Sequence, residues 1–282
     1  MKFDQLQNQW SRIRQNFTHF TWGGTWALSL SVENRKNLTF FFYDGLFAAA
    51  SDKIVLTYLT IYILSLGATR QQIGLLSSLS NFAAALMLLP AAMLVERTGK
   101  RQQITIAGAS ASRLVVLMMA VIPFFLKDFS GLIWLLLGLG LLREVFNNIG
   151  YPGWIALTGD IVPIEGRGRY FGARNFIMGL AGIITALLIG EAITQIGGPL
   201  GYQISFILAA ILGGFSIYFF SRLKDPQKDH QSDGQTSSNL KAILSSIKGH
   251  PDFIAFILFA AVWNFSINIF APFFNVFMVD TL

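Results

Sequence analysis

The sequence predicts an all-α protein, a polytopic membrane helical bundle. The chain is 53% hydrophobic and only 13% charged, whereas soluble domains carry about 25% charged residues. Its mean hydropathy is +0.54, and its apolar residues gather in runs of the roughly 20 residues that an α-helix needs to span a bilayer. Backbone groups in lipid must pair within their own segment, so these runs are predicted to be helices. We therefore expect the lipid bilayer to be a partner of this chain.

The chain opens with a polar segment, residues 1–38, which we expect to be cytoplasmic. Five of its apolar side chains recur at three- and four-residue spacing, so a helix would place them on one face: Phe3, Leu6, Trp10, Ile13 and Phe17. Such a pattern is typical of an amphipathic helix lying on a membrane surface. A polar tail with scattered aromatic residues is the alternative.

Seven segments are long and apolar enough to cross a membrane. In chain order they are Phe40–Leu66, Ile73–Val95, Ile104–Leu126, Leu132–Leu157, Phe176–Ile196, Tyr202–Leu223 and Phe253–Met278. The first six form a predicted six-helix unit, residues 39–223. Residues 224–252 are polar and contain Pro, Gly and Ser, which is typical of a linker, and residues 253–282 hold the seventh span.

The basic residues predict the orientation of these spans. Sixteen Lys and Arg side chains fall on the side of the N-terminus, the second-to-third loop, the fourth-to-fifth loop and the linker, against two on the other side. Cytoplasmic loops carry such an excess, so we expect a cytoplasmic N-terminus. The net charge of +6 comes from short clusters between apolar runs, so we expect no nucleic-acid partner.

The second-to-third loop carries a compact charged motif, LVERTGKRQQ. It resembles the signature of the major facilitator superfamily, which reads glycine, three residues, Asp, Arg, any residue, Gly and two basic residues. Matched residue by residue, Ala92 and Glu96 stand for the glycine and the Asp. The remaining positions are identical or conservative matches: Arg97, Gly99, Lys100 and Arg101.

The fourth-to-fifth loop is similar to the corresponding loop of bacterial transporters of that superfamily. Its sequence TGDIVPIEGRGRYFGARN supplies Asp160, Arg167 and Arg169. The resemblance implies the six-helix N-terminal half of such a transporter plus one further transmembrane helix. It also implies that both loops form a gate, in which Arg97 or Arg101 pairs with Asp160.

The resemblance further implies the function of a secondary transporter, or permease, that moves a small solute by alternating access. We expect coupling to a proton or another ion, and a location in the bacterial inner membrane. A second half-transporter or a second copy of the chain is an expected partner. No catalytic residue, metal-ligand set or cofactor motif stands out, so we expect no enzyme, no metal and no cofactor.

Seven ionisable residues fall inside the predicted spans, where charge is costly and is usually functional. They are Asp44, Asp52, Lys53, Arg113, Arg143, Glu144 and Glu191. Arg113 lies near the middle of its span and is the strongest functional candidate, with Asp52 or Glu144 to neutralise it. We expect Arg113 or Arg143 to meet an anionic group, and Asp52 or Glu144 to take up and release a proton. Permanent ion pairs that lock the helices together are the alternative.

The fourth span contains FNNIGYPGW, whose Asn148 and Tyr151 are further candidates for the substrate pathway. Pro152 and two glycines predict either a broken helix that presents free carbonyls or an ordinary proline kink. In the fifth span, Gly182, Ala186 and Gly190 recur at four-residue spacing, which predicts close helix packing.

Three other functions fit parts of the pattern. A seven-helix receptor or photoprotein has the right number of spans, but the last span has no lysine to carry retinal. A truncated remnant that does not transport, or a half-transporter that needs a partner, would also show six spans plus one.

Overall fold

The computed structural model describes residue 16 and residues 19–126, 129–225 and 251–281, and this part of the chain contains no β-strand. After a short 3₁₀ helix, η1 (Thr25–Ser29), six helices are long and apolar enough to cross a membrane. They are α2 (Val32–Ser65), α3 (Arg70–Thr98), α4 (Arg101–Phe125), α5 (Leu132–Ile161), α6 (Ile164–Ile196) and α7 (Gly198–Ser221). The last described helix is α9 (Pro251–Thr281). The polytopic helical bundle is therefore confirmed.

The helices are longer than the apolar runs from which they were predicted. Helix α2 starts at Val32 rather than Phe40, and the side chain of Ser31 caps it by accepting a hydrogen bond from the Asn34 N–H. Helix α6 starts directly after Pro163, twelve residues before the predicted Phe176. Hydropathy detects only the stretch that fits in lipid, whereas helices continue into the interface. Arg167 and Arg169, predicted in a loop, thus lie on the first turns of α6.

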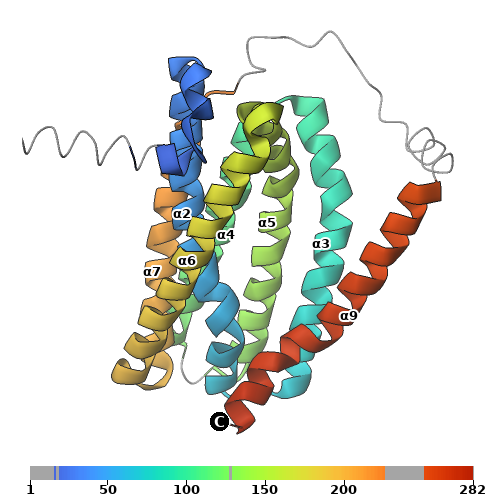
Figure 1. The fold of residues 1–282 in the computed structure, drawn as a ribbon. Coiled ribbons are helices and arrows are strands. Elements are labelled where there is room, and N and C mark those ends of the chain that lie inside the picture. Colours follow the sequence, from blue (N-terminus) through green and yellow to red (C-terminus); the bar gives the residue numbers. More distant parts are fainter. Residues whose placement is uncertain (1–15, 17–18, 127–128, 226–250, 282) are drawn as a thin grey trace, which may run out of the picture.

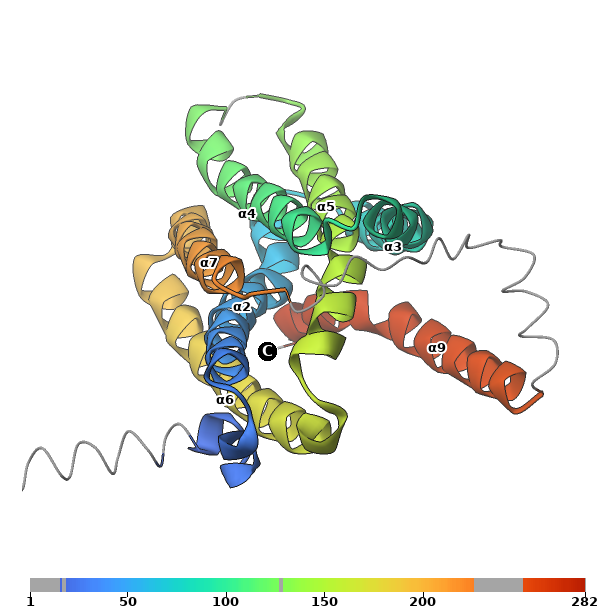
Figure 2. The ribbon, with the colours of Figure 1, turned by 90° about the horizontal axis from the view of Figure 1, so that it is seen from above.

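Successive helices run in opposite directions, so alternate connections lie at the same end of the bundle (Figure 1). The residues before α2, the α3–α4 turn, the α5–α6 turn and residues 222–225 all lie at the end that we call the basic end. Helix α2 packs against α6 and α7, α4 packs between α5 and α7, and α3 packs on α5. Helix α9 slants away from the bundle (Figures 1 and 2): its C-terminal end meets the bundle, where it contacts α2 and α3, and its N-terminal end stands apart from the other helices.

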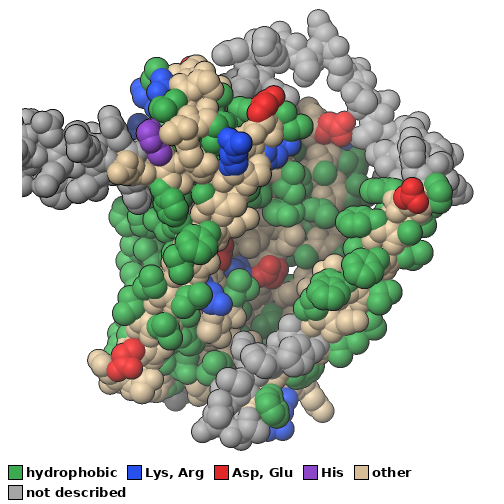
Figure 3. All heavy atoms as spheres, viewed as in Figure 1, with side chains coloured by type: hydrophobic (Ala, Val, Ile, Leu, Met, Phe, Trp, Pro, Cys, Tyr) green, Lys and Arg blue, Asp and Glu red, His purple; other side chains and the backbone are tan. Residues whose placement is uncertain are grey.

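Two apolar cores hold the helices together, one at each end of the bundle. The core at the basic end includes Leu38, Phe41 and Tyr170. The core at the opposite end includes Tyr62 and Phe206, whose rings meet edge to face at 5.1 Å. The outer surface is covered by large exposed apolar side chains (Figure 3), as expected of a surface that meets lipid. The ion-paired residues Asp44, Asp52, Arg113 and Arg143 lie along their helices between the two cores.

The charged turn between α3 and α4 is almost entirely helical. Glu96 and Arg97 belong to the last turn of α3, and Arg101 is the first residue of α4. Only Gly99 and Lys100 separate the two helices, and Gly99 has a φ of 64°. This left-handed conformation favours glycine, which explains why the motif needs a glycine between its charges.

Two predictions fall on residues outside the described part of the chain. The amphipathic helix over Phe3–Phe17 is one of them. The other is the linker, of which the structure describes only Lys224, Asp225, Pro251 and Asp252. Both stay predictions.

Candidate functional site

Arg113 forms an ion pair deep inside the bundle. Its Nη1 donates to Oδ1 of Asp52 at 2.5 Å, joining α4 to α2, and only 11% of the Arg113 side chain is exposed. Of the two acids that the sequence offers to neutralise Arg113, the structure therefore selects Asp52. The Arg113 side chain lies against Gly213 of α7, where a Cβ atom would collide with it.

A second arginine reaches the same carboxylate. Arg143 donates from Nη1 to Oε1 of its neighbour Glu144, and its Nη2 lies 3.8 Å from Asp52 Oδ1. Asp52 is thus shared by two guanidinium groups. The Nε atoms of Arg113 and Arg143 are buried and have no hydrogen-bond partner in the described part of the chain.

A third ion pair lies closer to the basic end. Asp44 and Arg174 are 3.8 Å apart between Oδ2 and Nη2, and each side chain is only 7% exposed. Ser216 donates to Asp44 at 2.7 Å, and the guanidinium of Arg174 lies 4.1 Å from the centre of the Phe41 ring. Asp44, placed near a span end by the sequence, is therefore enclosed rather than at the interface.

Arg174 is the buried charge that sequence reasoning missed. The predicted fifth span begins at Phe176, so Arg174 was counted among the basic residues of the preceding loop. In the structure it lies about three turns into α6. A four-residue spacing in the sequence could have revealed its burial, because Gly166, Tyr170 and Arg174 form one buried stripe on α6.

Most of these charged residues line a cavity of about 520 Å³ inside the bundle, and Arg143 is not part of its wall. Its wall includes Asp44, Asp52, Arg113, Glu144 and Arg174. The face viewed in Figure 3 is hollowed between α6 and α9, and acidic and basic side chains show there at mid-height. A cavity of this size accommodates a small organic molecule.

The remaining wall of the cavity is amide and aromatic. Asn147, Asn148, Tyr151 and Trp154 lie along α5, and the rings of the last two stack with their centres 6.2 Å apart. Asn148 donates its side-chain N–H to the backbone oxygen of Glu144 at 2.9 Å. The structure thus brings both sequence candidates from this span, Asn148 and Tyr151, to the same cavity as Arg113.

Helix α5 runs unbroken from Leu132 to Ile161, so the prediction of a broken helix at Pro152 is wrong. The glycines around that proline serve packing instead. A Cβ at Gly153 would lie 2.6 Å from the backbone oxygen of Arg101, and Thr105 donates to the oxygen of Gly150 at 3.0 Å. The predicted seam on α6 also serves packing, because Tyr58 of α2 donates to the backbone oxygen of Ala186 at 2.6 Å, and a Cβ at Gly190 would lie 2.8 Å from the Tyr58 hydroxyl.

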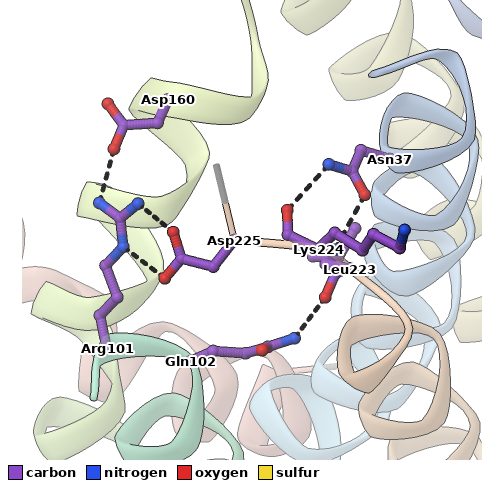
Figure 4. Close-up of polar contacts among 7 residues, drawn as sticks. All are labelled: Asn37, Arg101, Gln102, Asp160, Leu223, Lys224 and Asp225. Atoms are coloured by element: carbon purple, nitrogen blue, oxygen red, sulfur yellow. Dashed lines mark hydrogen bonds and ion pairs between the residues drawn. The ribbon is translucent and has the colours of Figure 1, made fainter. Parts of the chain in front are cut away.

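The charged residues of the α3–α4 and α5–α6 turns divide into a cluster around Arg101 and several exposed side chains, and Figure 4 shows the cluster. Arg101 donates to Asp160 at 2.6 Å and makes two hydrogen bonds to Asp225, one of them from Nε at 2.8 Å. Of the two arginines expected to pair with Asp160, Arg101 is the partner. Glu96, Arg97 and Lys100 are exposed on the α3–α4 turn.

The same cluster anchors the start of the linker. Asn37 accepts a hydrogen bond from the Lys224 N–H at 3.0 Å and donates to the Lys224 oxygen at 2.9 Å, while Gln102 donates to the Leu223 oxygen at 2.7 Å. Arg167 donates to the oxygen of Gly159 at 2.6 Å, so it caps the end of α5. Arg169 is exposed, and only its backbone lies close to Gly23.

Replacing Gly213 with Ala is expected to lower the free energy of unfolding by about 1 kcal/mol relative to Gly214→Ala, because the new methyl group displaces Arg113. Gly214 is the matched control, since a Cβ there meets nothing within 4 Å. The control also measures the gain in helix propensity that any such change brings. Denaturant unfolding in detergent gives both values, and equal midpoints would contradict the assigned position of Arg113.

Comparison with known proteins identifies a family. The model of the family described as Major Facilitator Superfamily matches residues 45–282. No curated protein matches the chain.

Proposed function

The chain belongs to the major facilitator superfamily, whose members are transporters, and on that premise we propose that it is a secondary transporter that moves a small solute by alternating access. The observation that carries this proposal is the charged cavity enclosed between α2, α4, α5, α6 and α7. The two arginines and three carboxylates on its wall would cost several kcal/mol unless they are paired or hydrated. Apolar side chains would pack the helices together without this cost, so we assign the charged cavity to binding of the solute.

The solute site in this proposal is formed by charged and aromatic groups at different depths. Arg113 and Asp52 lie at mid-depth, whereas Tyr151 and Trp154 lie nearer the basic end. A polar group of the solute would compete with Asp52 for the guanidinium of Arg113, and an apolar part would pack on the stacked rings. A solute that replaces Asp52 as the partner of Arg113 would thereby break the Arg113–Asp52 ion pair.

The Arg101 cluster is the gate at the basic end in the same proposal. It joins the ends of α4 and α5 to the start of the linker through Asp160 and Asp225. We place this end in the cytoplasm because it carries most of the basic residues. The bacterial inner membrane, and a second half supplied by another chain or another copy, stay predictions.

Transport can be tested before the solute is known. Proteoliposomes that contain the purified chain are loaded with a mixture of small metabolites, and the metabolites that leave are identified by mass spectrometry. We expect at least one to leave faster than from protein-free liposomes, and Arg113→Ala to abolish that release. If no metabolite leaves faster, the transporter proposal for this chain fails and the interpretation as a non-transporting remnant gains support.

A further inference from the structure

The structure contains a second cavity, of about 330 Å³, between α2, α3 and α5. It follows α3 from Ile73, in the first turn of the helix, to Ala84, which is about 16 Å of helix. It therefore extends from the end opposite the basic end to mid-depth. Several polar side chains line it: Thr60, Ser77, Ser80 and Asn81. A cavity of this size with hydroxyl groups on its wall can hold water.

One residue lines both cavities. Glu144 belongs to the wall of the central cavity and to the wall of the second cavity, and the two walls share no other residue among those described. The side chain of Glu144 is 29% exposed. Its carboxylate thus lies at the partition between a cavity on the basic side and a cavity on the opposite side.

The neighbouring charges distinguish Glu144 from the other two carboxylates. Asp52 is shared by Arg113 and Arg143, so its neutralisation would leave two guanidinium groups facing each other without an acid. Neutralising Glu144 leaves Arg143 with Asp52 still 3.8 Å away. Asp44 is enclosed by Ser216 and Arg174 and lines only the central cavity.

The other elements around Glu144 add few charges. Helix α4 contributes Arg113 and helix α2 contributes Asp52, whereas the α3 side chains that line the second cavity are uncharged. Arg174 and Asp44 lie across the central cavity and form their own pair. The three arginines and three carboxylates balance when all are ionised, so a proton that binds gives the site one net positive charge.

We propose that Glu144 is the proton-coupling site of this transporter, loaded from water in one cavity and unloaded to water in the other. This inference rests on the proposed transport function. On loading, the Glu144 carboxylate takes a proton from water and its hydrogen bond from Arg143 is given up. On unloading, the proton returns to water and the Arg143 bond reforms. The added positive charge favours simultaneous binding of a solute anion.

Proton binding can be measured without knowing the solute. Proteoliposomes adsorbed on a solid-supported membrane are stepped to lower pH, and the displaced charge is recorded. We expect a transient in the wild-type chain that Glu144→Gln reduces to the level of protein-free liposomes. Glu144→Asp should retain it, because the carboxyl group is kept. Glu191→Gln is the control, since Glu191 is exposed on α6, bonded by Gln195 and outside both cavities.

Infrared spectroscopy gives an independent measure of the protonated carboxyl group. Infrared difference spectra on acidification should show the C=O band of this protonated group in the wild type and in Glu191→Gln, but not in Glu144→Gln. All variants are first checked for a monodisperse peak in size-exclusion chromatography.

Several results would overturn the assignment of Glu144. They are a transient that persists in Glu144→Gln, a transient lost in Glu191→Gln as well, and the absence of a transient in the wild type. The metabolite-release assay is independent of these results. A transporter that is not proton-coupled would release a metabolite but give no Glu144-dependent transient, whereas a protein that does not transport would release none.

Discussion

Replacing Arg174 with Met is expected to lower the free energy of unfolding by about 3 to 5 kcal/mol, the range found when one partner of a buried ion pair is removed. The change leaves Asp44 enclosed, with Ser216 as its remaining hydrogen-bond donor. It also removes the guanidinium that lies over Phe41. Denaturant unfolding of the purified chain in detergent would measure the loss.

The matched control is the double variant Asp44→Asn, Arg174→Met. It removes both charges and keeps a polar group that can bond Ser216, so we expect it to recover most of the lost stability. If the single variant is as stable as the wild type, the Asp44–Arg174 pair does not hold α2 to α6. If the double variant is no more stable than the single one, the loss comes from packing rather than from an uncompensated charge.

Replacing Arg101 with Ala is expected to cost about 2 to 3 kcal/mol, because hydrogen bonds to charged groups that are mostly out of water are lost. The side chain of Arg101 is 9% exposed and that of Asp225 10%, but Asp160 is 34% exposed and recovers hydration. The expected loss is therefore smaller than for Arg174. Thermal unfolding in detergent is a sufficient measurement.

Arg97→Ala is the control for this change. Arg97 belongs to the same charged motif but is exposed in the last turn of α3, so its removal should change stability by less than about 0.5 kcal/mol. Equal effects of the two substitutions would mean that the motif acts through its net charge. A large effect of Arg97 alone would contradict the assignment of Arg101 as the gate partner.

The sequence predicts the architecture well because lipid imposes a length and a composition on every span. The resemblance of the two charged turns to family motifs implied that Arg97 or Arg101 pairs with Asp160, and the structure shows that the partner is Arg101. It does not predict where a helix begins in the interface, where polar residues are tolerated. Arg174 was therefore assigned to a loop, and the ion pair with Asp44 was missed.

The roles of the glycines could not be predicted either, since they depend on what the neighbouring helix presents. Gly213 leaves space for Arg113, and Gly153 allows the backbone of α4 to approach α5. From the sequence, the glycines beside Pro152 indicated a break in the helix as readily as close packing. That Glu144 lines two cavities is a property of three helices together, which one sequence does not reveal.

We expect the central cavity to open to the two sides of the membrane in turn, as alternating access requires. The chain has no cysteine, so a thiol introduced by Ala109→Cys is its single labelling site. Ala109 lies one helical turn from Arg113 on the wall of the central cavity, so its labelling measures whether a reagent can enter that cavity. Sealed vesicles of both orientations are treated with a membrane-impermeant thiol reagent. We predict labelling from both sides of the membrane. Labelling from one side only would contradict alternating access.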